Sequence, residues 1–239
     1  MSVENYPFIV YGLAPIFNIP GINNLVLSKE ALAKIFRGCN NETSNECLPG
    51  SITSWGDPLI KATNPPAIHQ QLDSAGKIQL ILPRDNTPTS RAFKQALSTF
   101  EVGFNQQIGS NNNNYWNGTK SIRKATSYGI LYTVSVTPGS ISFEKIDLNV
   151  DQVGVNQISL INANNEPIYP DRSALFSTVL EIGMNFGNHG TDPSLHQVSL
   201  LGPLAARSWP ISIAQEVFSI QINLFRNSRK MLQSTNSLA

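Results

Sequence analysis

Residues 77–104 read KIQLILPRDNTPTSRAFKQALSTFEVGF and join three kinds of local structure in one stretch. The apolar run at 77–83 predicts a short buried strand, and apolar residues at helical spacing predict a helix over 88–104. A polar turn connects the two. Because strands and helices also alternate along the rest of the chain, we expect an α/β fold.

The remaining segments carry their own start and stop signals. Residues 121–136 suit a helix in their first part and a strand at their end, so both interpretations stay open. No internal repeat is found. The other predicted elements are a strand over 8–19 broken by Pro15, helices over 29–37, after Asp57 and after Asp171, and strands over 139–143 and 216–224.

The composition is that of a folded chain with a modest charge. Of its 239 residues, 41% are hydrophobic and 14% are charged, with 17 basic and 16 acidic residues and a net charge of +1. Such a mixture can bury a core. Because the sequence contains no cluster of Lys and Arg, we expect neither nucleic acid nor an acidic membrane as a partner. No stretch approaches the ~20 apolar residues that cross a bilayer.

The turn at residues 83–93 carries the chemistry that can be interpreted. It places Arg84, Asp85, Thr87, Thr89 and Ser90 between a buried strand and the first turn of a helix. The first turn of a helix offers unpaired N–H groups and a positive dipole end. Arginine adds a fork of donors that suits tetrahedral oxyanions. These five residues are our predicted anion-binding residues.

An ordinary helix start explains the same turn. Asp85 or Thr87 would then be the N-cap, Pro88 would occupy the favoured first helical position, and Arg84 would be solvated or paired with Asp85. We find no pattern of a nucleophile with its base and no ligand spacing for a metal, so we expect no catalytic residue, no metal and no cofactor.

A polar loop is flanked by the two cysteines of the chain, Cys39 and Cys47. A bridge between them would stabilise the fold by roughly 2.5 kcal/mol. Asn41 lies in a glycosylation sequon inside this loop, and Asn117 lies in a second one. Together they favour an oxidising, extracellular setting, with two free thiols and chance sequons as the alternative. The start of the chain does not resemble a signal peptide, so we expect that signal to lie upstream of a fragment.

Five ordered segments resemble the phosphate-binding proteins of phosphate ABC transporters, which have the type II periplasmic-binding-protein fold. Residues 11–21 resemble the family pattern Gly-x-x-x-Pro-x-Tyr-Asn-x-Pro-Gly, and residues 32–38 resemble Leu-Ala-x-Ile-Phe-x-Gly. Residues 52–60 are similar to Ile-Thr-x-Trp-Asn-Asp-Pro-x-Ile. Residues 138–144 and 208–212 resemble the later segments Gly-x-Ile-Gly-Tyr-Val-Glu and Trp-Pro-Ile-Thr.

The resemblance implies most of the second lobe of a two-lobed receptor, with a mixed sheet flanked by helices. It places residues 7–208 in this incomplete lobe, including the Cys39–Cys47 loop and an Asn-rich loop at 110–114. It makes residues 209–239 a crossing strand and tail that return toward the missing first lobe. The buried tryptophans expected from it are Trp55 and Trp209, whereas Trp116, after the Asn run, is expected to be partly exposed.

The turn resembles the family's Arg-Ser-Asp-Gly-Ser-Gly-Thr, followed by a Phe that Phe93 matches, but departs from it in two ways. The turn is one residue shorter, so Arg84 falls one position past the family arginine. Pro88 stands where the family has glycine, and proline has no N–H to offer. With the first lobe also missing, the resemblance implies weak or altered anion binding by this chain alone.

We therefore expect a non-catalytic solute-binding module for phosphate or a similar oxyanion, secreted or at a cell surface. The alternative is a binding-fold ectodomain without a ligand, which acts in protein recognition or structure. A phosphatase-like enzyme ranks last. The partners that this implies are a small inorganic oxyanion and either the missing first lobe or a surface partner.

Overall fold

The computed structural model confirms the α/β class. It describes residues 3–39, 47–85, 87–110, 116, 121–146, 154–186 and 207–220. Six strands are hydrogen-bonded in the order β2-β6-β1-β5-β3-β4, while β7 pairs with β6 and β8 pairs with β1. The strands are β1 (Val3–Asn18), β2 (Leu25–Leu27), β3 (Gln79–Pro83), β4 (Ile122–Lys124), β5 (Ser140–Lys145), β6 (Asn156–Ile161), β7 (Pro167–Ile168) and β8 (Ser212–Ile220).

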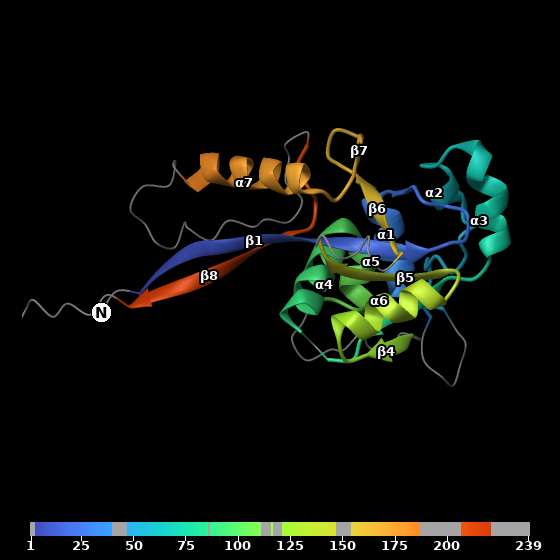
Figure 1. Ribbon diagram of the computed structural model, residues 1–239, viewed down its shortest axis with the longest axis horizontal. Coiled ribbons are helices and arrows are strands. Elements are labelled where there is room, and N and C mark those ends of the chain that lie inside the picture. The colour runs from blue at the N-terminus through green and yellow to red at the C-terminus, as the bar shows by residue number, and fades with distance from the viewer. Residues whose placement is uncertain are drawn as a thin grey trace, which may run out of the picture.

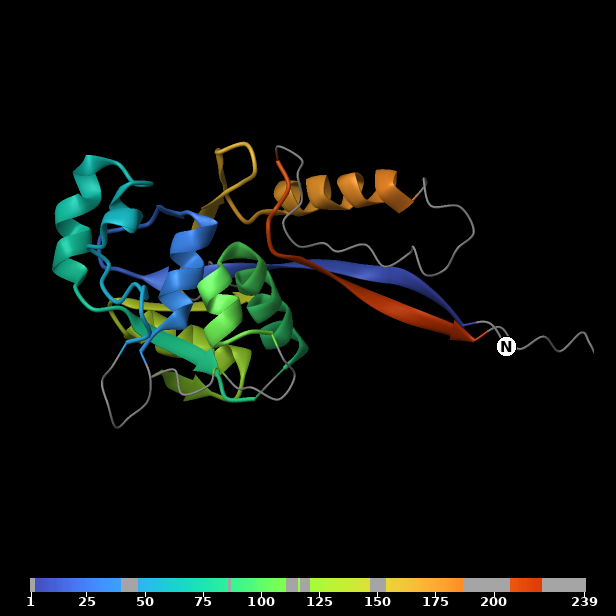
Figure 2. The ribbon, with the colours of Figure 1, turned by 180° about the vertical axis from the view of Figure 1, so that it is seen from behind.

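Helices cover both faces of this mixed sheet (Figures 1 and 2). Helix α6 packs on one face through a small cluster that includes Ile81, Ile130 and Val134. Helices α1, α4 and α5 lie on the other face, over the larger core. The helices are α1 (Lys29–Arg37), α2 (Pro58–Lys61), a 3-10 turn η1 (Pro66–Ile68), α3 (His69–Ala75), α4 (Pro88–Phe100), α5 (Val102–Gln107), α6 (Ser127–Val136) and α7 (Arg172–Phe186).

Strand β1 belongs to two structures at once. From residue 13 to Asn18 it is the middle of the sheet, antiparallel to β5 and β6. Before that it pairs with β8 in a two-stranded ribbon that extends out of the body, with α7 beside it (Figure 1). The strand predicted over 216–224 is thus confirmed up to Ile220, and it begins earlier, at Ser212.

Pro15 does not break the strand, so that prediction was wrong. The carbonyl of Gly12 accepts the N–H of Ile146, the residue after β5, and the N–H of Leu13 donates to the carbonyl of Ile211 on the opposite side of the strand. Because the bonding direction alternates along a strand, the nitrogen of Pro15 points to the same edge as that of Leu13. At that position β1 pairs with neither β8 nor β6, so the missing N–H costs no ladder bond.

Local signals predicted the helix starts. Ser28, Asp57 and Asp171 each accept a backbone N–H at the beginning of their helix, and α1 has the bounds expected from the sequence. The open segment 121–136 contains both elements in the reverse of the expected order: strand β4 comes first and helix α6 follows. The helix expected over 88–104 is two helices, because Glu101 is extended and its carboxylate caps α5.

An aromatic cluster fills the space between α4 and the sheet. The rings of Phe93 and Phe143 are stacked with centroids 4.0 Å apart, and Phe36 meets Phe93 edge-on at 5.0 Å. Trp55 and Trp209 are buried, as expected, but Trp116 is only 1% exposed and the expectation for it was wrong. Its indole belongs to this same cluster, in contact with both phenylalanines of the stack.

A largely buried ion pair between Arg37 and Glu101 lies at the C-terminal end of α1. The guanidinium of Arg37 donates to Glu101 at 3.2 Å and to Gln107, and it also reaches the carbonyl of Pro49. The nearby Cys39–Cys47 bond is present, which confirms the predicted disulfide. Residues 110–114 and both sequons, at Asn41 and Asn117, lie wholly or largely outside the described residues, and glycosylation stays a prediction.

Replacing Arg37 with alanine should lower the free energy of unfolding by about 3 kcal/mol, because Glu101 would be left as an uncompensated, largely buried charge. Urea denaturation measures this loss. The matched control is Lys34→Ala on the same helix, whose exposed pair with Glu30 should be worth about 0.5 kcal/mol or less. Equal losses in the two variants would contradict a structural role for the buried pair.

Candidate functional site

Strands β3, β4 and β5 finish at the same end of the sheet, which we call the carboxyl edge. Strand β3 runs parallel to both β4 and β5, so their carboxyl ends lie together. The chain enters α4 from the end of β3 and α6 from the end of β4. Because residue 13 of β1 is opposite Lys145, the last residue of β5, the β1–β8 ribbon also leaves the body from this edge. Clefts at the carboxyl ends of strands are where open α/β sheets bind ligands.

The β3–α4 turn places four of the five predicted residues at this edge. Thr87 is the N-cap of α4: its hydroxyl accepts the N–H of Ser90 at 3.1 Å. Thr89 is half-buried, and within the described chain its hydroxyl has no hydrogen bond. Asp85 is exposed, and its carbonyl accepts the N–H of Thr87.

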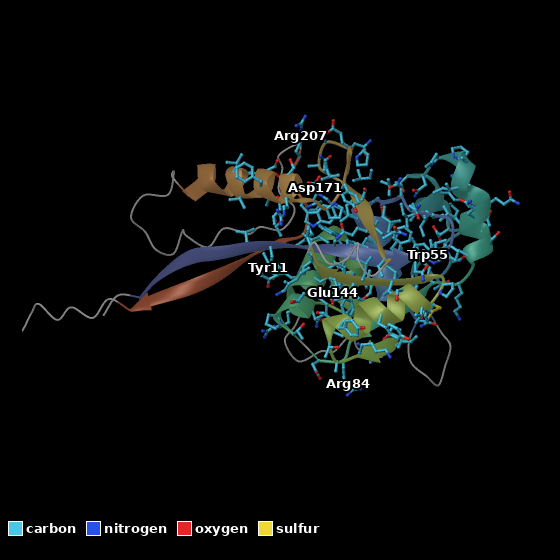
Figure 3. The ribbon with its side chains drawn as sticks, viewed as in Figure 1. Tyr11, Trp55, Arg84, Glu144, Asp171 and Arg207 are labelled. Atoms are coloured by element: carbon cyan, nitrogen blue, oxygen red, sulfur yellow. A yellow bond between two sulfur atoms is a disulfide. The ribbon has the colours of Figure 1, made fainter. Side chains whose placement is uncertain are left out.

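Arg84 is exposed, and Figure 3 shows its side chain directed away from the body of the protein. Its backbone N–H donates to the carbonyl of Lys124 at 2.7 Å, which ties the turn to the end of β4. The guanidinium is therefore available at the edge rather than committed to a partner inside the fold.

Ser90 is the exception among the predicted residues. Its side chain is 1% exposed, and its hydroxyl accepts the indole N–H of Trp116 at 3.2 Å. The hydroxyl therefore lies under the turn, against the aromatic cluster, and not with Arg84 and Thr89 on the surface. Ser90 therefore attaches the first turn of α4 to the core through its hydrogen bond with Trp116.

Further cations, which sequence reasoning did not identify, gather at the same edge. Lys124 lies at the end of β4, with its side chain beside Gly129 of α6. The guanidinium of Arg123 reaches the carbonyl of Pro83 at 3.4 Å, and burial lowers the pKa of Arg123. Arg91 follows Thr87 by one helical turn. No local pattern signals this group, because only the pairing of β3 with β4 brings it together.

Glu144 is a largely buried carboxyl at the end of β5. Burial raises the pKa of Glu144, although the Ser127 hydroxyl, the N–H of Lys145 and the charge of Lys145 all favour its ionised form. The ammonium of Lys145 lies 4.6 Å from the ring centre of Tyr11, where the ribbon begins. The carboxyl edge therefore carries an acid that is costly to ionise beside several cations.

Replacing Glu144 with glutamine should remove one source of pH dependence in stability. Because the pKa of Glu144 is raised on folding, its contribution favours the folded state at low pH and is lost as the pH rises through the folded-state pKa. The variant should lack that loss and be more stable than the parent at neutral pH. Thermal unfolding between pH 4 and 8 measures both curves, and parallel curves would contradict the assignment.

Comparison with known proteins identifies phosphate-binding proteins as relatives of the chain. No protein-family model matches the chain. The phosphate-binding protein PstS 2 of Mycobacterium tuberculosis (strain ATCC 25618 / H37Rv) is 26% identical over 212 residues, 86% of this chain and 50% of the relative. PstS 3 of Mycobacterium leprae is 26% identical over 211 residues, 88% of this chain and 51% of the relative. The chain thus spans about half the length of the curated relatives that it matches.

Solved structures show the same fold. The ancestral soluble variant of the human phosphate binding protein has a TM-score of 0.57 at 16% identity, covering 98% of this chain and 63% of that structure. The phosphate-binding protein from Stenotrophomonas maltophilia has a TM-score of 0.54 at 14% identity, covering 91% of this chain and 55% of that one. The predicted resemblance and the periplasmic-binding-protein fold are confirmed. The curated relatives are named as phosphate-binding proteins.

Proposed function

We propose that this chain is a non-catalytic solute-binding module that holds phosphate or a similar oxyanion at the β3–α4 turn. The observation that carries the proposal is the position of Arg84, which has no ion-pair partner in the described part of the chain and lies beside the N-terminus of α4, at the edge from which the β1–β8 ribbon leaves. The curated relatives are phosphate-binding proteins, which supports the choice of anion.

The donors at the turn divide into two groups. The guanidinium of Arg84 and the hydroxyl and N–H of Thr89 can face an anion, with Asp85 beside them. Thr87 and Ser90 hold the turn in shape, one as the helix cap and the other under Trp116. Pro88 offers no N–H. Because so few donors face the anion, and only from one side, we expect weaker binding than in a cleft that closes around it.

A second lobe would complete the site. The ribbon supports this part of the proposal, because β1 and β8 leave the body from the same edge as the site. We propose that residues 7–208 are one lobe and that residues 209–239 return toward another. Closure of two lobes around an anion is a common hinge movement.

We also propose that the protein acts outside the cytoplasm, secreted or at a cell surface. The Cys39–Cys47 bond supports this setting, since disulfides persist in oxidising compartments. Among the described residues, no helix is both long and apolar enough to cross a membrane.

A ligand-free module for protein recognition is the second candidate. The inward position of the Ser90 hydroxyl and the proline at position 88 favour it, because both reduce the number of donors that face solvent. The two candidates differ in one result, the effect of Arg84 on phosphate binding.

Replacing Arg84 with glutamine should abolish phosphate binding, because it removes the charged fork while keeping a stem of similar length. We expect the parent chain to bind phosphate more weakly than micromolar, so a titration followed by phosphorus NMR is the suitable measurement. Arg172→Gln, an exposed cation at the start of α7, is the matched control and should leave binding unchanged. Unaltered binding in Arg84→Gln would favour the second candidate.

Replacing Pro88 with alanine should strengthen phosphate binding about threefold, because it restores one N–H at the first position of α4. The same titration measures the effect. Circular dichroism checks that α4 still forms, since proline is favoured at this position. Weaker binding in a folded Pro88→Ala variant would show that the helix N-terminus does not face the anion.

A further inference from the structure

The outer face of α6 carries three large apolar side chains in a row. Tyr128, Tyr132 and Val136 are spaced four residues apart, so they lie on successive turns of one helix face. Their exposed fractions are 74%, 56% and 57%, respectively. We call these three residues the α6 stripe. Because their spacing places them on one side of a single helix, they form one continuous surface that is open to solvent.

The opposite side of α6 already packs on the sheet. Ile130 and Val134 are buried in the small cluster with Ile81, and the main contacts of the helix are with strands β1, β3, β4 and β5. A position two residues from a buried one lies about 200° around the helix, which is where the stripe is. None of the ten residues of α6 is charged, so the helix is apolar on both sides. A helix that is apolar all round is normally covered on both sides.

The lack of charge on α6 restricts the kind of surface that can cover it. Helices that lie on membranes carry Lys and Arg on their polar face, and a surface for nucleic acid needs the same cations. Helix α6 has neither residue. Tyrosine instead combines an apolar ring with a polar tip, and it is enriched at interfaces between proteins. The surface that suits the stripe is therefore neutral and largely apolar, and a second copy of the stripe is such a surface.

The stripe is also complementary to itself. If two copies of α6 cross antiparallel about a two-fold axis at Tyr132, the two Tyr132 rings meet at the axis. Each Tyr128 then lies opposite Val136 of the other copy, because both residues are four positions from the centre. A large side chain thus meets a small one on each side of the axis. An interface of this symmetry is closed, so association stops at two copies.

A groove lies just beyond the C-terminal end of the stripe. Its volume is about 440 Å³, and Pro20, Gln71 and Pro138 are among the residues that line it. Pro138 follows the last residue of α6 by two positions. Because helical side chains point toward the N-terminus of their helix, the ring of Tyr128 in an antiparallel copy extends past Val136 toward this groove. The groove gives the most exposed residue of the stripe a place to pack.

We propose that the outer face of α6 is an interface between two copies of this chain, arranged antiparallel with Tyr132 on the two-fold axis. The exposed area of the stripe is about 350 Å² per copy, whereas stable interfaces bury about 800 Å² per partner. The dimer is therefore weak, with a dissociation constant of about 100 μM. Helix α4 lies on the other face of the sheet, so the proposed dimer leaves that helix uncovered.

Sedimentation velocity of the chain between about 10 and 500 μM measures the association, and the parent should change from monomer to dimer over this range. Tyr132→Lys should weaken association about tenfold or more, because it places two like charges at the axis. Val102→Lys is the matched control, since Val102 is a similarly exposed apolar residue on α5, on the other face of the sheet. It should leave association unchanged. Circular dichroism checks that both variants are folded.

A pair of opposite charges tests the two-fold arrangement. Tyr132→Lys and Tyr132→Glu should each remain monomeric alone, and an equal mixture of the two should form a dimer, because opposite charges then meet at the axis. A parent that stays monomeric over the whole range overturns the inference, as does a Tyr132→Lys variant that associates like the parent. Failure of the mixture to associate overturns it too. A monomeric parent that binds neutral phosphatidylcholine vesicles through Tyr132 would assign the stripe to a lipid surface instead.

Discussion

The stacking of Phe93 on Phe143 is the contact on which the carboxyl edge depends. It holds α4 against β5, and Trp116 closes the same cluster while its indole N–H holds the hydroxyl of Ser90. The first turn of α4 is therefore positioned from inside the core rather than by surface contacts. An anion site needs such fixed donors, because donors that must be ordered on binding cost affinity.

Two structural demands use hydroxyls of the β3–α4 turn that a ligand could otherwise bind. A helix start needs an acceptor for its first N–H groups, and Thr87 supplies it. A tightly packed core needs a partner for the buried indole, and Ser90 supplies that. What remains for a ligand is mostly charge, carried on long side chains at the rim. Charge at a rim attracts anions over a distance but encloses them poorly.

Local chemistry explains which parts of the fold were predictable from sequence. Helix caps such as Ser28 and Asp171 act within a few residues, and the predicted starts are confirmed. Pro15, Trp116 and the approach of Arg123 and Lys124 to the β3–α4 turn were missed or misjudged because each depends on partners distant in sequence. Pro15 is paired with Phe143 of β5, far along the chain, and Arg84 meets Lys124 only through strand pairing. A resemblance across ordered segments predicted the fold, but it could not show where the hydroxyls point.

The central position of β1 has a consequence for how the chain folds. It is the first strand in the sequence, yet its partners β5, β6 and β8 all come late, and Leu13 bonds to Trp209 from 196 positions away. During synthesis β1 must therefore wait for β5 and β6, and longer still for β8, before its pairing is complete. Contacts of such long range slow folding and leave apolar strand edges unprotected in the meantime. A chaperone that covers these exposed strand edges would protect the nascent chain from aggregation until its partners are synthesised.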